Sequence, residues 1–439
     1  MLPEAQLGLS LLFSLSLNLS TSSGFVLPET PTLAPKAQVG VLRSLISEAL
    51  STHPSQKSQA LLIQSAQAGV DSARWQFYPT PSVAVEGASA STTDNAYAGD
   101  STVTTLRLQQ PLWTGGRLTA GLQKAQANVT ATRASLEDTR QQLALRVVQN
   151  YGDWLGAHLK ILANEKSMAT HIRLREQVKR RIEQGLSSES DLTQAVARLE
   201  SLVSDIAVSR AQQDIAAARL AQLVGRPVTT YSLSGVLASP NTLSLGLHAL
   251  LDQAQAINPS IQKAQALAQV QESVIAERRA DLYPEVYLRA EQQYGNYAYR
   301  NAPSVSRLFI GLSSHFGPGL SSRSSLEGAQ SQHQAALEEV NAQSRAVSEQ
   351  VQTDFALAAS SQGRLTALKT SLNAAQEVSN SYDRQFLAGR KTWLDVMNAA
   401  RELAQTETQL ADIEATQLAV TWRLAITTQG LSEAMAGQP

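Results

Sequence analysis

The chain has 439 residues, a length that ordinarily means two or three domains, yet only 5% of them are aromatic and the formal net charge is −1. The balanced charge excludes a basic nucleic-acid-binding protein. The absence of cysteine excludes a disulfide scaffold, thiolate metal sites and a lipidated N-terminal cysteine. Ala, Gln, Ser and Leu dominate instead, and such small side chains suit the seams between packed helices.

The first residues differ from the rest in composition. An apolar stretch at 7–19 precedes small polar residues, so we predict a signal peptide over 1–24 and an N-terminal extension over 25–40. The segment 1–6 has no Lys or Arg, which departs from the charged start that signal peptides usually have. No other segment is apolar enough to predict a transmembrane helix.

The remainder of the chain repeats itself at about 205 residues. Proline and glycine residues align the two copies, because His53-Pro54-Ser55 recurs as Asn258-Pro259-Ser260 and Gly225 recurs as Gly430. We therefore predict two copies of one structural unit, over 41–225 and 247–430. A linker over 226–246 joins them, and a C-terminal tail follows over 431–439.

The first copy opens with a helix and a hairpin. Apolar residues at helical spacing predict a helix over 41–77 that is interrupted at Pro54. Period-two alternation then predicts strands over 82–91 and 102–110, separated by a polar loop.

A long helix follows this hairpin. The stretch 117–184 has no proline and almost no glycine, and at 1.5 Å per residue it would be about 100 Å long. After Gly185 a second helix over 189–224 would measure about 54 Å, and the helix at 41–77 about 55 Å. Stacked end to end, the two shorter helices would match the long one.

The second copy has the same order of elements. We predict a first helix over 247–282 and two strands over 284–293 and 304–313. Two further helices follow, over 320–388 and 392–429.

The strands have the length that a tilted transmembrane strand needs. Four strands cannot close a barrel, since about eight is the minimum, and an open sheet edge is not tolerated in lipid, so we predict that chains associate. The residues leave open whether two, three or four copies do so, and whether the hairpins are instead soluble with one wet face.

Alternation within the strands predicts which residues face lipid. If the strands cross a membrane, the lipid-facing residues are Leu106, Leu108, Val286, Leu288, Leu308 and Ile310, and the residues that line the barrel are Arg107, Arg289 and Arg307. The pair Leu112-Trp113 lies at the joint between strand and helix, where the ring either packs or anchors at the interface.

The duplicated plan, the segment Gln110-Pro111-Leu112-Trp113-Thr114-Gly115-Gly116 and the segment Gly389-Arg390-Lys391-Thr392-Trp393-Leu394-Asp395-Val396 resemble the TolC family of outer-membrane export channels. The resemblance covers about residues 40 to 430. It implies a mainly α-helical fold in which a homotrimer forms a twelve-stranded β-barrel in the outer membrane and an α-helical tunnel in the periplasm. It also implies a periplasmic adaptor and an inner-membrane ABC transporter or RND-type pump as partners.

No catalytic motif is present in the sequence. The six histidines are scattered, and zinc-protease, phosphate-loop and serine-hydrolase motifs are absent. We predict a protein that is not an enzyme and has no cofactor or bound metal.

The turns between the long helices are the candidate functional sites. Gly185 and Gly389 mark the two hairpin tips, and Asp191 and Asp395 follow each glycine by six residues. Glycine suits a helix C-cap and an acid suits the first turn of a helix, so a structural role alone accounts for all four residues.

The resemblance implies a second role for the tips, a gate at the periplasmic entrance. It implies that Asp191 pairs across the coiled coils with Lys391, and that Asp395 contributes to a ring of carboxylates that favours cations. Lys391 is a weaker lock than a bidentate arginine, and the adjacent Arg390 could replace it.

Two residues depart from the family pattern at this gate. Phe386 stands where the family has a gating tyrosine, and Asn398 stands where a second acidic ring would lie. A phenyl ring cannot make a phenolic hydrogen bond, so the resemblance implies a looser gate or one that rests on apolar packing.

Several functions are compatible with these predictions. The segments 70–80 and 111–116 resemble channels that serve ABC transporters, which favours type I secretion of proteins such as adhesins or toxins. The alternatives are the outer-membrane component of a multidrug efflux pump and a periplasmic coiled-coil adaptor. A soluble helical enzyme has no supporting residue.

Overall fold

The computed structural model describes residues 40–90, 94–229, 245–314 and 321–436. Residues from Val39 onward form one compact unit. The predicted signal peptide lies outside the described residues, as do nearly all of the predicted N-terminal extension and most of the predicted linker.

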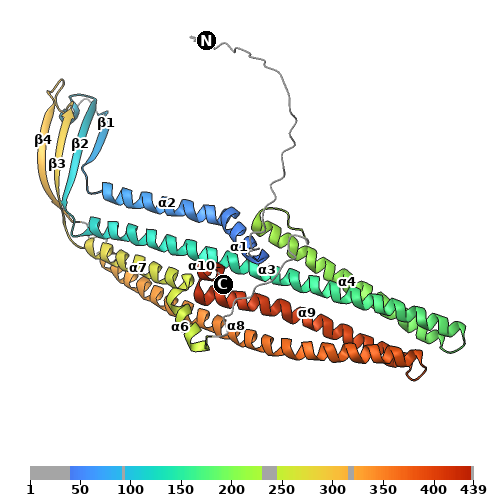
Figure 1. The fold of residues 1–439 in the computed structure, drawn as a ribbon. Helices are drawn as coiled ribbons and strands as arrows, with labels where there is room; N and C mark the ends of the chain where they lie inside the picture. Colours follow the sequence, from blue (N-terminus) through green and yellow to red (C-terminus); the bar gives the residue numbers. More distant parts are fainter. Residues whose placement is uncertain (1–39, 91–93, 230–244, 315–320, 437–439) are drawn as a thin grey trace, which may run out of the picture. The chain divides into compact units, whose positions relative to one another are not determined.

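The described elements fall into two repeats of the same order (Figure 1). The first consists of α1 (Val41–Thr52), α2 (Pro54–Trp75), β1 (Thr80–Gly87), the 3-10 helix η1 (Asn95–Tyr97), β2 (Thr102–Trp113), α3 (Arg117–Glu183) and α4 (Glu189–Val224). The second consists of α6 (Leu247–Ile257), α7 (Pro259–Ala280), β3 (Glu285–Tyr294), β4 (Val305–Ser313), α8 (Ser321–Leu387) and α9 (Trp393–Gln429). The predicted two-repeat plan is confirmed.

A short helix, α10 (Leu431–Ala436), occupies most of the predicted C-terminal tail. Its Ala434 is buried in the central hydrophobic core, so α10 packs against the rest of the fold.

The prolines explain where the first helix of each repeat is interrupted. Proline lacks a backbone N–H and is tolerated at the first position of a helix, so Pro54 and Pro259 each begin a new helix. The preceding His53 and Asn258 cap these helices through side chains that accept the backbone N–H of the residue after the proline, at 3.2 and 3.0 Å.

The strands form one antiparallel sheet in the order β1-β2-β3-β4. Strand β1 ends at Gly87 rather than at residue 91, because its last partner is Thr102, the first residue of β2. Strand β2 continues past residue 110 to Trp113, since its pairing with β3 goes on through a bulge between Pro111 and Trp113. Pro111 has no backbone N–H to donate to the neighbouring strand, and a bulge accommodates this. The bulge also interrupts the alternation of side chains between the two faces, on which the predicted strand end depends.

Each long helix is flanked by two shorter ones. α3 packs against α2 and α7 towards the sheet and against α4 and α9 towards the hairpin tips (Figure 1). α8 packs against α7, α6 and α9. The helices therefore form one layer in which a long helix runs continuously beside a stacked pair of short ones, the arrangement that the helix lengths predict.

The main hydrophobic core lies at the middle of α3. Tyr151 and Trp154 of α3 stack with ring centroids 5.9 Å apart, and they are buried together with Leu45 of α1, Leu220 of α4 and Trp422 of α9. The core joins both repeats, because α9 belongs to the second.

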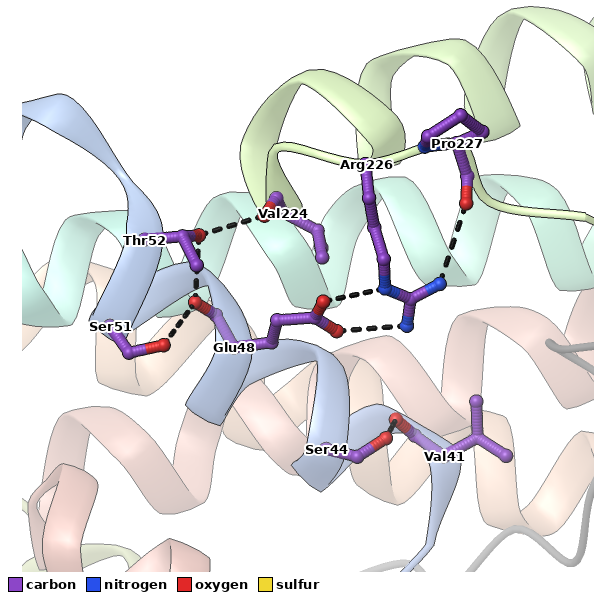
Figure 2. A network of polar contacts seen from close by, with 8 residues as sticks. All are labelled: Val41, Ser44, Glu48, Ser51, Thr52, Val224, Arg226 and Pro227. Carbon is purple, nitrogen blue, oxygen red and sulfur yellow. Dashed lines mark hydrogen bonds and ion pairs between the residues drawn. The ribbon is translucent and has the colours of Figure 1, made fainter. Parts of the chain in front are cut away.

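A polar network holds α1 against the end of α4 (Figure 2). The Glu48 carboxylate accepts hydrogen bonds from Arg226 Nε and Nη2 at 2.5 and 2.8 Å. Thr52 Oγ1 donates to the Val224 carbonyl at 2.7 Å and so satisfies an oxygen that the end of α4 would leave free. The network fixes the point at which the chain leaves the first repeat.

A buried ion pair joins α8 to α9. Asp354 is fully buried and receives hydrogen bonds from Arg423 Nε, at 2.8 Å to Oδ2, and from Gln350 Nε2 at 2.9 Å. A buried carboxylate is costly unless its oxygens are hydrogen-bonded, so Arg423 is the group that makes this carboxylate tolerable.

Replacing Arg423 should therefore destabilise the protein strongly. We expect Arg423→Met to lower the free energy of unfolding by about 3–5 kcal/mol, because it leaves a buried charge without a partner. The matched control is Arg323→Met, since Arg323 is 83% exposed and pairs with Glu327 one turn away, so its loss should cost about 0.5 kcal/mol or less. Denaturant titrations followed by circular dichroism measure both values, and equal values would contradict the prediction.

Candidate functional site at the hairpin tips and the sheet faces

Both hairpin tips end their first helix with the same backbone motif. Gly185 and Gly389 have φ of +71° and +72°, in the left-handed region. Each glycine N–H bonds back to the carbonyl three residues earlier, and the following N–H bonds to the carbonyl five residues before it, at 2.8 Å in both tips. This is a Schellman motif, and it explains why glycine stands at each tip.

Both return helices begin with a capping box. Ser188 Oγ accepts the Asp191 N–H at 3.3 Å while the Asp191 carboxylate accepts the Ser188 N–H at 3.1 Å. Thr392 and Asp395 make the same exchange, and Thr392 Oγ1 also donates to Asp395 Oδ2 at 2.7 Å. The hydrogen bonds from the Thr392 side chain and backbone hold the pKa of Asp395 below its usual value, so the carboxylate is ionised at neutral pH.

Among the ion pairs of the described residues, none joins Arg390 or Lys391 of the second tip to an acid of the first tip. Lys391 Nζ lies 4.3 Å from the centre of the Tyr382 ring, a cation–π contact within its own hairpin. No ion pair between Asp191 and Lys391 occurs among the described residues of the chain. A pair between two copies of the chain stays a prediction. The side chain of Arg390 is exposed.

Phe386 is buried at the place where the two hairpins of one chain meet. It is 2% exposed and lies in a tip cluster with Trp393, at a centroid distance of 6.0 Å, and with Leu174 and Val178 of α3. We call this set, completed by Ala195, Val396, Met397 and Ala400, the tip cluster. In this position a tyrosine hydroxyl would need a partner that the phenyl ring does not require.

Two arginines of α3 contact the end of α8, and neither is among the residues that the sequence analysis selected. Arg181 lies 4.6 Å from the centre of the Phe386 ring and donates to the Phe386 carbonyl at 3.3 Å. Arg173 forms an ion pair with Asp383 at 2.7 Å. These residues are about 205 positions apart in the chain, so only the repeat spacing hints at their proximity.

Asn398 follows Asp395 by one helical turn on α9 and is exposed, whereas Val396 and Met397 between them are buried. Asp395 and Asn398 therefore share the side of α9 that points away from the tip cluster. Asn398 has no charge, so it cannot supply the second acidic ring that the resemblance implies at this position.

The strand register places all the charged side chains of the four strands on one face, which also holds Val103, Val305 and Phe309. The six residues predicted to face lipid lie on the other face, which we call the apolar face, because Leu106 is level with Val83, and Leu288 with Ile310. Its large side chains are solvent-exposed in the single chain, including Val83, Val85, Leu106, Leu108, Leu288, Leu308, Ile310 and Leu312. That they contact lipid stays a prediction.

The opposite face, the charged face, holds the three arginines predicted to line the barrel. Arg107, Glu291 and Arg307 are directly paired across three strands, and Arg289 follows two residues from Glu291. Arg107 Nε donates to Glu291 Oε1 at 2.8 Å.

Exposed aromatic side chains gather at both ends of the sheet. At the joint with the helices, Trp113 packs edge-on against Tyr283 at 6.3 Å and remains half exposed, so its ring both packs and reaches solvent. Gly115 makes this joint possible, because a side chain there would collide with Tyr283 and its φ is +62°. At the loop end, Tyr294 and Tyr299 are exposed. Aromatic girdles at both ends of an apolar band are typical of outer-membrane strands.

Two kinds of site are absent from the residues that the structure describes. No helix among them is long and apolar enough to cross a membrane. The same residues contain no group of His, Asp and Glu arranged to hold a metal ion.

The comparisons with known proteins agree with this geometry. The model of the outer membrane efflux protein family matches residues 45–226 and 250–425, most of the chain. Outer membrane protein TolC of Vibrio cholerae is 26% identical over 289 residues, which cover 62% of this chain and 64% of TolC, so the match spans a little under two thirds of that relative. Alkaline protease secretion protein AprF of Pseudomonas aeruginosa is 24% identical over 345 residues, which cover 76% of this chain and 71% of AprF.

A solved structure shows the same fold. The outer membrane protein VceC of Vibrio cholerae superposes with a TM-score of 0.76 at 17% identity, covering 89% of this chain and 97% of VceC. The fold is therefore that of the outer-membrane channel-tunnels. By its match to the family model, the chain belongs to the outer membrane efflux protein family, whose members lie in the outer membrane and extend into the periplasm.

The tip glycines allow a test in which the two substitutions have opposite effects. Gly389→Ala places a side chain in the left-handed region and should destabilise the protein by about 1–2 kcal/mol. Gly363→Ala, in the middle of α8 with open space around it, should instead stabilise it by about 1 kcal/mol. Thermal unfolding measures both, and a stabilising Gly389→Ala would show that the Schellman turn does not form.

Proposed function

We propose that three copies of this chain form an export channel, in which the sheets close a twelve-stranded barrel in the outer membrane and the helices line a periplasmic tunnel. The observation that carries the proposal is the four-stranded sheet, with one face wholly apolar in its exposed large side chains, a charged opposite face, and edge strands β1 and β4 that each have one neighbour. Such a sheet is stable in lipid only if its edges pair with other copies.

Three copies suit the family, whose members form trimeric channels that work with adaptors and inner-membrane transporters. Pairing of β4 in one copy with β1 in the next would leave no free edge, and the apolar faces would form one continuous outer surface. The helical layers would then continue from the barrel as a tunnel wall.

The transporter partner that we propose is an ABC transporter of a type I secretion system. The support is the similarity to AprF, whose name describes secretion of a protein, together with the segments at 70–80 and 111–116. The second candidate is multidrug efflux, which the description of the matched family favours.

The channel proposal is tested first by assembly and conductance. An unheated gel of the outer-membrane fraction should show a band at three times the mass of one chain, which is 47.1 kDa before the predicted signal peptide is removed, and planar bilayers should show discrete conductance steps. A soluble monomer without conductance would contradict the proposal.

Deleting the gene separates the two candidates, since type I secretion predicts loss of secreted proteins and efflux predicts greater drug sensitivity.

We further propose that the hairpin tips gate the periplasmic entrance. In this gate, apolar packing would hold the hairpins together where the resemblance to the TolC family implies polar links. Phe386 and Trp393 hold the second hairpin against α3, and the Arg173–Asp383 ion pair adds a charged link beside them. Asp395 would contribute to an acidic ring that favours cations, with Lys391 and Arg390 available to acids of a neighbouring copy.

Removing the buried phenyl ring should open this gate. Phe386→Ala removes a ring that is 2% exposed, at a cost of about 3–5 kcal/mol in local packing, so conductance should rise and cells should become sensitive to large antibiotics. The control is Leu387→Ala, because Leu387 is the next residue but is 64% exposed and should leave conductance unchanged. Equal conductance in both variants, with normal trimers, would show that the tip cluster does not gate the channel.

A further inference from the structure

The charged face of the sheet concentrates arginines at one level. Ser82, Arg107, Glu291 and Arg307 form a single row across all four strands. Arg289 lies in the next row of the same face, level with Gln109 and Phe309. We call Arg107, Arg289 and Arg307 the arginine belt.

One carboxylate, that of Glu291, pairs with two of these three guanidinium groups. Arg107 Nε donates to Glu291 Oε1 at 2.8 Å, and Arg289 Nε lies 3.1 Å from the same oxygen. Arg307 Nη1 instead donates to Gln293 Oε1 at 2.9 Å, and an amide carries no charge. The belt therefore has a surplus of positive charge at this level.

The other acids of this face do not neutralise the belt. Glu285 is engaged by Arg117 at the start of α3, at 2.6 Å. Glu86 lies four residues along β1 from Ser82, about 13 Å at 3.3 Å per residue, which is beyond a Debye length at physiological salt.

Arg289 is held in place with donor capacity left over. Its guanidinium lies 4.7 Å from the centre of the Phe309 ring and 5.9 Å from that of Tyr287. Gly311 leaves room for the Tyr287 ring, since a side chain there would approach the ring to 2.4 Å. Arg289 Nε is buried without a hydrogen-bond partner among the described residues, although it is near Glu291, because its N–H is not directed at that oxygen.

We propose that the arginine belt is a binding site for polyanions, compounds or segments with several phosphate or carboxylate groups, inside the barrel. This inference rests on the proposed trimer, in which nine arginines and three glutamates would surround the lumen at this level. The planar guanidinium fork matches phosphate and carboxylate oxygens, and rings of arginine are what anion-conducting pores use. The barrel would then attract anions while the acidic ring at the tips attracts cations.

The test uses intact trimers in planar bilayers at about 0.1 M salt, with inositol hexakisphosphate as the probe. Added from the loop side of the barrel, the probe should block current, and the block should weaken as salt is raised. Arg307→Gln, which removes one charge from each copy, should raise the half-blocking concentration by about tenfold, the effect of three exposed ion pairs. Glu291→Gln should lower it.

Arg300→Gln is the matched control, because it removes the same charge from an exposed position in the loop between β3 and β4. Its block should resemble that of the wild type. If the channels conduct and the probe blocks wild type and Arg307→Gln equally, the proposal that the arginine belt binds polyanions is overturned. If Arg300→Gln loses the block, the binding site lies in the loop and not in the belt. Absence of conductance in the wild type overturns the channel itself, so the two failures are distinguishable.

Discussion

The backbone at the two free edges of the sheet is the constraint on which the rest of the structure depends. β1 and β4 each have one neighbour, so a row of N–H and C=O groups on each would remain unpaired in lipid. Water cannot satisfy these groups there, and another copy of the chain can. The exposed apolar face makes the same demand, because eight large side chains have no cover in the single chain. Assembly is thus a condition of the fold in a membrane.

The helices transmit this requirement to the far end of the molecule. α3 and α8 each run through 67 residues without a break, so the position of a strand fixes the position of a hairpin tip about 100 Å away. The central core at Tyr151 and Trp154, together with the buried Asp354–Arg423 pair, keeps the long helices in register with their short neighbours. The hairpin tips of associated copies are therefore arranged with the same symmetry as the paired sheet edges.

Much of this fold can be predicted from the sequence, because its signals are local. Prolines mark the helix breaks, the two tip glycines mark the turns, and strict alternation marks which strand residues share a face. The alternation places the end of β2 too early, at residue 110, since the pairing beyond Pro111 depends on a bulge that only the partner strand reveals. The Arg173–Asp383 and Arg181–Phe386 contacts could not be predicted, because they depend on how α3 and α8 are rotated against each other.

The composition of the tip cluster has a mechanical consequence. Leu174, Val178 and Ala195 come from the first repeat, and the remaining members come from the second. Neither hairpin can swing away alone without exposing the ring of Phe386 or Trp393 to water. An opening that separates the two hairpins of one chain therefore has to break the tip cluster, whereas with the cluster intact the two hairpins move together and only the seams between copies can widen.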